Sequence, residues 1–218
     1  MIGFYDYTVI LTFLSVASSL FGMTRAMAGD FKGAVFCLAL SGLLDTFDGK
    51  VARSKKNRTE DEKLYGIQLD SLADVICFGV FPVMICYLMG VRGVLGCLAG
   101  VFYCLCGVIR LAYFNVLETN RQMGADGGEK VYHGLPITSI SVILPLVFLL
   151  GFLVSDEVFR WILLGMLVLV GGLFVTDFKL RKPKNWMIAC LIVLVGCTVM
   201  VILLYSRHHI PVPFGGGL

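Results

Sequence analysis

The sequence contains few charged residues for its length. They make up 15% of the 218 residues, whereas a soluble domain usually carries about 25%. Hydrophobic residues make up 58%, and several apolar runs reach the roughly 20 residues that cross a bilayer as a helix. This balance excludes an ordinary water-soluble domain and predicts an integral membrane protein.

The sequence also lacks the signals that would divide or shorten the chain. No Pro- or Ser-rich linker interrupts it, so we expect one membrane-embedded domain over residues 1–206 and a flexible tail over residues 207–218. The first apolar run has neither a basic start nor a small-residue cleavage site, which argues against a signal peptide. No internal repeat is evident, and this disfavours an inverted-repeat transporter.

Metal-binding cysteine patterns are absent as well. The eight cysteines are scattered through apolar segments, without a CxxC pair or a Cys/His cluster. Within helices such cysteines are most simply small apolar residues. We therefore expect neither a zinc site nor a disulfide framework.

The apolar runs predict an all-α membrane protein of about seven transmembrane helices joined by short polar segments. The third predicted helix contains Pro82, which a membrane helix tolerates when neighbouring groups bond the freed carbonyl. The predicted helices cover residues 7–28, 32–56, 64–89, 92–117, 135–153, 157–176 and 185–205.

Basic residues are concentrated in the joints after the second, fourth and sixth predicted helices. The positive-inside rule makes this side cytoplasmic, which puts the N-terminus in the cytoplasm and the C-terminus outside. The basic side carries Lys55, Lys56, Arg58, Lys63, Arg121, Lys130, Lys179, Arg181, Lys182 and Lys184, and the other side carries Arg25, Lys32, Arg92, Arg160 and Arg207.

Four aspartates interrupt the apolar pattern of the second and third predicted helices. Asp45 and Asp48 are three residues apart, and Asp70 and Asp74 are four apart, so each pair projects from one helix face. The joint between these helices is short, which makes them antiparallel neighbours. We therefore expect all four carboxylates to converge near the cytoplasmic end of the bundle.

Such a cluster needs compensating positive charge. A carboxylate deep in the membrane costs about 2.5–3.5 kcal/mol even on a lenient scale. Two divalent cations would neutralise four carboxylates, and Mg²⁺ typically shares its oxygen ligands between protein and substrate phosphates. The alternative is that the aspartates pair with Lys50, Arg53 or Lys55, or lie in the headgroup layer.

Small residues lie on or beside the same helix faces, at Gly49, Ala52 and Gly66. They either leave room for a bulky ligand near the backbone or allow close helix packing of the small-xxx-small kind. Their spacing by itself does not distinguish these two uses.

In this order, the acidic and small residues resemble the signature of the CDP-alcohol phosphotransferase family, D-x2-D-G-x2-A-R-x8-G-x3-D-x3-D. One departure is that twelve residues separate Arg53 from Gly66, which we interpret as a longer cytoplasmic turn. The matching positions are Asp45, Asp48, Gly49, Ala52, Arg53, Gly66, Asp70 and Asp74.

The resemblance implies a six-helix membrane core, usually dimeric, with a dinuclear Mg²⁺ or Mn²⁺ site facing the cytoplasm. The seventh helix would be an addition at the C-terminal end. The four aspartates would hold the metals, with Asp74 also the general base. Gly49, Ala52 and Gly66 would make room for the cytidine nucleotide of a CDP-linked lipid, and Arg53 would steady it.

Three further stretches resemble the integral-membrane phosphatidylserine synthases within this family. They are "LDSLADVICFG" (69–79), "RLAYFNV" (110–116), where the subfamily more often has Arg at Tyr113, and "HGLPIT" (133–138). This similarity implies CDP-diacylglycerol and L-serine as substrates, membrane lipids and a second copy of the chain as partners, and no nucleic acid.

An acceptor site for serine should offer a cation to its carboxylate. Arg110 and Arg121 are candidates because guanidinium grips carboxylate or phosphate in bidentate fashion. Asn115 either contacts substrate or caps its helix, and Lys130 either meets a lipid phosphate or contributes only to the positive-inside bias.

Two other functions are weighed against serine transfer. The same chemistry could use glycerol phosphate, inositol phosphate or an amino alcohol as acceptor. A cation-coupled transporter would need acidic residues through the membrane depth, whereas these four aspartates share one neighbourhood.

Overall fold

The computed structural model describes residues 3–4, 7–52, 55, 59–122, 132–180 and 185–204. Within them the chain forms the seven helical segments that the apolar runs predict, so the all-α fold is confirmed. The tail over residues 207–218, together with Arg53 and Lys130, lies outside the described residues.

Helices account for almost all of the regular structure. A short 3₁₀ turn, Tyr7–Val9, leads into the first helix, and another, Ile137–Ser139, precedes the helix that begins at Ile140. Tyr132–His133 (β1) and Lys179–Leu180 (β2) form a two-residue antiparallel pair. The helices are α1 (Ile10–Met27), α2 (Phe31–Ala52), α3 (Glu60–Asp74), the π-helical segment η2 (Val75–Val80), α4 (Phe81–Leu88), α5 (Gly93–Gln122), α6 (Ile140–Leu150), α7 (Asp156–Val175) and α8 (Asn185–Leu204).

Helix boundaries differ from the prediction where local capping intervenes. The third helix begins at Glu60 rather than at residue 64, because Thr59 and Glu62 form a capping box, which satisfies two backbone donors at the helix start. The fifth predicted helix, over residues 135–153, corresponds to α6 and ends at Leu150, three residues earlier than predicted, and Gly151 follows it.

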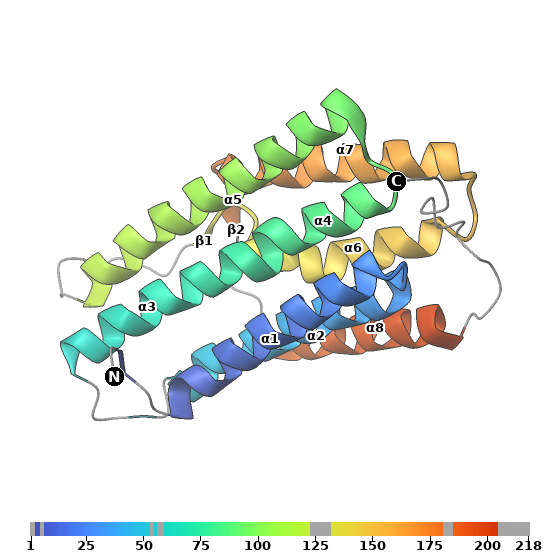
Figure 1. Ribbon diagram of the computed structural model, residues 1–218. Coiled ribbons are helices and arrows are strands. Elements are labelled where there is room, and N and C mark those ends of the chain that lie inside the picture. The colour runs from blue at the N-terminus through green and yellow to red at the C-terminus, as the bar shows by residue number, and fades with distance from the viewer. Residues whose placement is uncertain are drawn as a thin grey trace.

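The helices pack as a bundle of long rods (Figure 1), with α1 along α2 and α5 along α7, while α2, α6 and α8 all contact one another. Among the described residues, four helical stretches are long and apolar enough to cross a membrane: Tyr7–Met27, Glu60–Leu88, Gly93–Asn120 and Asp156–Val175. The length and apolar character of these stretches are those of a multi-pass membrane protein.

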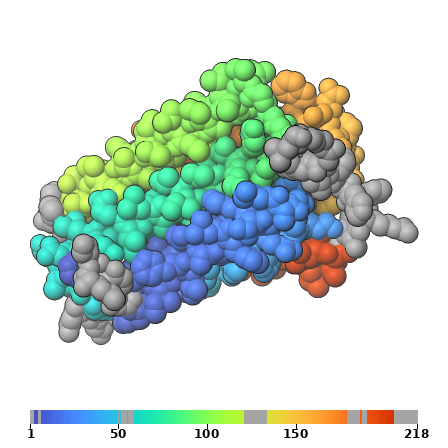
Figure 2. Space-filling view, in the orientation of Figure 1, coloured from blue at the N-terminus to red at the C-terminus, as the bar shows by residue number. Residues whose placement is uncertain are grey.

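Many apolar side chains are exposed along the helices of the bundle. Figure 2 shows α1, α3, α4 and α5 side by side on one face of the bundle. Phe21 on α1 and Leu98 on α5 are each 60% exposed. Large apolar side chains facing outward along whole helices are expected where lipid, rather than water, surrounds the protein.

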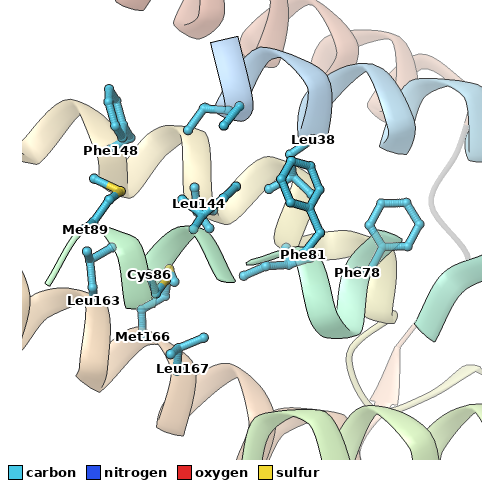
Figure 3. Packing of buried hydrophobic residues seen from close by; sticks show 14 of the residues in the cluster. Leu38, Phe78, Phe81, Cys86, Met89, Leu144, Phe148, Leu163, Met166 and Leu167 are labelled. Carbon is cyan, nitrogen blue, oxygen red and sulfur yellow. The ribbon is translucent and has the colours of Figure 1, made fainter. Parts of the chain in front are cut away.

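The core lies where α2, η2, α4, α6 and α7 meet. Figure 3 shows Phe81 among Leu38 of α2 and Leu144 of α6, and all three are fully buried. Gly22 of α1 fits against this core because a Cβ there would overlap the Phe81 ring and lie 2.6 Å from the Cβ of Cys37. The absence of a side chain at Gly22 therefore lets α1 approach α2 and α4 closely.

The turn between α1 and α2 holds these helices antiparallel. Asp30 accepts hydrogen bonds from the Gly33 N–H (3.0 Å) and from the Arg25 guanidinium. Partial burial opposes ionisation, but the Gly33 and Arg25 bonds outweigh it and hold the pKa of Asp30 below its usual value. The stabilisation that this carboxylate contributes is therefore present above its unfolded-state pKa and is lost as the pH falls through its lower folded-state pKa.

Candidate active site

Three of the four signature aspartates meet between α2 and α3. One carboxylate oxygen from each of Asp45, Asp70 and Asp74 lies within 4.8 Å of the others. Asp74 is only 9% exposed, while Asp45 and Asp70 are half-buried. The predicted convergence of the two helix faces is confirmed for these residues.

The fourth aspartate, Asp48, lies in the same neighbourhood. It is 8% exposed and lies near enough to Asp70 and Asp45 to be repelled by their charges. The Thr12 hydroxyl of α1 donates a hydrogen bond to Asp48 Oδ2 over 3.3 Å. Thr12 therefore fixes the orientation of a carboxylate that the sequence assigned to the site.

The donor set suits a hard divalent cation. Such ions bind carboxylate oxygens at roughly 2.0–2.6 Å, so two ligands of one ion lie no more than about 5 Å apart. The 4.8 Å limit for Asp45, Asp70 and Asp74 is compatible with this spacing. Clustered and buried carboxylates also repel one another unless positive charge is supplied. The residues present thus fit a divalent-metal site.

Basic side chains were the alternative source of positive charge. Lys55 forms an ion pair with Glu62 at 3.1 Å. Lys50 belongs to α2, but its side chain is outside the described part of the structure, and Arg53 is outside it altogether. Ala52 ends α2, again without a described side chain, and Gly49 and Gly66 are half-buried beside the aspartates.

A buried layer of small polar residues lies behind the carboxylates, where α1 meets α2. The Ser15 hydroxyl lies 3.3 Å from the Ser41 carbonyl and 3.5 Å from Cys77 Sγ, and the Ser19 and Ser41 hydroxyls are 2.8 Å apart. This layer was not predicted from the sequence. Thr12, Ser15 and Ser19 do recur at spacings of three and four residues, which marks one face of a helix.

Asn115 lies within α5, not at its end. Its side-chain oxygen accepts a hydrogen bond from the Ser71 hydroxyl (2.6 Å), and its amide nitrogen donates to Gln68 Oε1 (3.4 Å). The suggestion that Asn115 caps its helix is therefore wrong, because α5 continues to Gln122. Asn115 instead ties α5 to the part of α3 that carries Asp70.

Arg110 connects α5 to α7 and to the loop before α6. It is 7% exposed, donates to the Phe174 carbonyl over 3.2 Å and lies above the Phe114 ring. Gly134 has a positive φ of 68°, and a Cβ there would lie 2.9 Å from Arg110 Nη1. Arg121 belongs to the last turn of α5, but its side chain is not among those described.

An apolar groove of about 470 Å³ runs between α2, α6 and α8. Thr46, the neighbour of Asp45 in the chain, is one of its lining residues, so the groove reaches the helix that carries two of the aspartates. The predicted seventh helix, which corresponds to α8, forms one wall. Other lining residues include Leu43, Ser141, Val195, Gly196 and Leu203.

Comparison with known proteins gives consistent matches. The family model described as CDP-alcohol phosphatidyltransferase matches residues 7–176, a range that ends before α8. The archaetidylserine synthase of Methanothermobacter thermautotrophicus is 35% identical over 144 residues, which are 66% of this chain and 58% of that protein. The chain thus matches less than two thirds of that relative's length.

Two further relatives are matched over more of their length. The CDP-diacylglycerol–serine O-phosphatidyltransferase of Saccharomyces cerevisiae is 31% identical over 199 residues, covering 82% of this chain and 70% of that protein. The protein of the same name from Helicobacter pylori is 31% identical over 187 residues, which cover 83% of this chain and 74% of that protein. The range of the family model, residues 7–176, includes α2 and α3.

Proposed function

Because the chain belongs to the CDP-alcohol phosphatidyltransferase family, we propose that it transfers the phosphatidyl group of CDP-diacylglycerol to the hydroxyl of L-serine. The products are phosphatidylserine and CMP. The observation that carries this proposal is the meeting of Asp45, Asp70 and Asp74 in a chain whose relatives are named for serine transfer.

Asp45, Asp48, Asp70 and Asp74 are the residues that would hold two divalent cations, Mg²⁺ or Mn²⁺. When bound, such ions supply positive charge to the pyrophosphate and to the leaving CMP. The donor set of carboxylate oxygens supports this assignment. Thr12 would keep Asp48 oriented toward the shared site through its hydroxyl.

Asp74 is proposed as the general base. It accepts the proton of the serine hydroxyl while the serine oxygen forms a bond to the phosphatidyl phosphorus. The bond from that phosphorus to the CMP oxygen breaks, and CMP leaves with the bonding electrons. The position of Asp74, 9% exposed and beside Asp45 and Asp70, supports a role at the reacting atoms.

Substrate binding is assigned to residues around the aspartates. Gly49, Ala52 and Gly66 would leave room for the cytidine nucleotide, and Arg53 would contact it. Arg110, Asn115, Arg121 and Lys130 are the candidates for binding serine or a lipid phosphate. The Arg110 and Asn115 contacts described above support a second role for both, which is to hold α5 against α3 and α7.

The basic residues after α2 and α5 support a cytoplasmic active site and N-terminus. The proposed unit is a single membrane-embedded domain over residues 1–206 that works as a homodimer. A cation-coupled transporter has no support among the relatives, whose names describe lipid synthesis.

The acceptor assignment is tested by CMP release from CDP-diacylglycerol with purified full-length protein and Mn²⁺ or Mg²⁺. Serine, glycerol 3-phosphate, inositol and inositol phosphate are compared as acceptors. We expect release with serine and little with the phosphorylated acceptors, because those need a dedicated basic pocket. Release that follows a different acceptor would retain the family chemistry and refute serine as the substrate.

The groove between α2, α6 and α8 is proposed to receive an acyl chain of the donor. Gly196 lines it, with open space around the position of a Cβ. Gly196→Phe should raise KM for a long-chain donor about tenfold, equivalent to losing roughly two buried CH₂ groups, and should leave a short-chain donor unaffected. Steady-state kinetics with both donors measures this difference.

Gly165→Phe on α7 is the matched control, because Gly165 also has open space around it but does not line the groove. It should leave KM for both donors unchanged. An equal rise of KM for long and short donors in Gly196→Phe would count against an acyl chain in this groove.

A further inference from the structure

The helix that carries Asp70 and Asp74 changes its winding directly after Asp74. The Val75 N–H bonds the Ser71 carbonyl four residues back, whereas the Phe81 N–H bonds the Ile76 carbonyl five residues back. The six residues of η2 between these points form a π-helix. Such widened turns are rare and are frequent at functional sites.

Pro82 leaves a backbone carbonyl of this widened turn without its usual donor. In an α-helix the N–H of residue 82 would bond the carbonyl of Phe78, and proline has no N–H. The Tyr103 hydroxyl, from α5, donates to that carbonyl over 2.7 Å. Cys104 Sγ lies 3.5 Å from the next carbonyl, that of Gly79. Side chains of α5 therefore satisfy two neighbouring carbonyls of η2.

Tyr103 is well suited to hold this geometry. Its side chain is 0% exposed, so the hydroxyl cannot exchange Phe78 for water. Its ring packs against Phe174 of α7, with centroids 5.3 Å apart. Because α5 also packs along α7, the hydroxyl is fixed relative to the rest of the bundle.

The widened turn sets the rotation of α3 relative to α4. α4 is fixed in the core, since Phe81, Ile85 and Cys86 are all 0% exposed. One residue corresponds to roughly 100° of rotation in an α-helix. The wide turn of η2 holds about one residue more than an α-helical turn. If η2 relaxed to regular α-helix, α3 would therefore rotate relative to α4 by about this angle. Asp70 and Asp74 would then no longer face Asp45.

We propose that Tyr103 is a positioning residue for the acidic site. By donating to the Phe78 carbonyl, which cannot receive the α-helical bond from Pro82, it maintains η2 and so directs Asp70 and Asp74 toward α2. Tyr103 acts through the backbone and needs no contact with substrate. The inference rests on the proposed function in one respect, namely that the aspartates hold a divalent cation.

Tyr103→Phe tests the proposal because it removes only the hydroxyl. We expect Mn²⁺ to bind about tenfold more weakly, because a buried carbonyl without a donor destabilises the wide turn and favours the relaxed winding in which Asp70 and Asp74 turn away from Asp45. Mn²⁺ binding to the purified full-length protein is measured from the disappearance of the free-ion EPR signal, without any assay of activity. Tyr87→Phe on α4 is the matched control, since Tyr87 is 47% exposed, and should bind Mn²⁺ like the unchanged protein.

A Tyr103→Phe variant that is folded but less heat-stable, with unchanged Mn²⁺ affinity, would reduce Tyr103 to a structural role and overturn the proposal. If Tyr103→Phe does not fold, the double variant Tyr103→Phe/Pro82→Ala is measured, because alanine in place of Pro82 provides a backbone N–H for the Phe78 carbonyl. Weak Mn²⁺ binding by a stable double variant supports the proposal, and unchanged affinity contradicts it. If the unchanged protein itself binds no Mn²⁺, the metal site of the proposed function fails, and this inference fails with it.

Discussion

Asp74→Asn should reduce the kcat of serine-dependent CMP release by about 10²–10⁴-fold, the contribution typical of a positioned general base. The amide keeps the size of the side chain but cannot take a proton from the serine hydroxyl. It also removes one of three clustered carboxylates. Because Asp74 is 9% exposed, bulk water has little access to the site and cannot readily take over its role as proton acceptor. The measurement is kcat at saturating metal and both substrates.

Asp61→Asn is the control for this substitution. Asp61 lies on the same helix, exposed in the first turn of α3 and nine residues before Asp70. It should retain the kcat of the unchanged protein. A second readout separates the two roles of Asp74: if it is the base, the acidic limb of the kcat–pH profile should disappear in the variant. Activity close to normal in Asp74→Asn would eliminate it as base and leave the mechanism without one.

Removal of divalent cations should abolish turnover. Metal ions at a phosphoryl-transfer site contribute several kcal/mol, so dialysis against a chelator should lower the rate by roughly 10³-fold or more. Addition of Mg²⁺ or Mn²⁺ should restore it. The physical reason is the cluster itself, since Asp45, Asp70 and Asp74 repel one another and the transferred phosphate unless cations neutralise them.

Thermal unfolding gives a measure of this binding that does not depend on activity. A cation that binds only the folded protein stabilises it by about 2.7 kcal/mol at a concentration of 100 Kd. Mn²⁺ should therefore raise the unfolding temperature of the unchanged protein. It should raise the unfolding temperature of the double variant Asp45→Asn/Asp70→Asn much less. Full activity in dialysed protein shown by elemental analysis to contain no divalent metal would refute the metal site.

Several features of the fold were predictable because they depend on neighbouring residues. The apolar runs located seven helices, and the bounds of α1, α7 and α8 differ from the prediction by only a few residues. The start of α3 was also encoded locally, since Thr59 and Glu62 have the spacing of a capping box. The spacing of the aspartates within α2 and within α3 put each pair on one face.

Other features follow from how the helices are packed. Nothing in the local sequence indicates that Thr12 of α1 meets Asp48 of α2, since they are 36 residues apart. The same holds for Asn115, whose bonds to Ser71 and Gln68 cross 44 and 47 residues. A sequence window reports which face of a helix is polar, but not which neighbour that face meets.

The sequence by itself therefore determined the membrane class, the helices and the acidic signature that identifies the family. Only the tertiary structure decided that α1 supplies Thr12 to the aspartates, that α8 completes an apolar groove and that Tyr103 holds the π-helical turn after Asp74. The physical reason is that hydrophobic runs and helix caps are set by residues within a few turns of one another. The rotation of one helix against another is instead set by close packing and hydrogen bonds between distant segments.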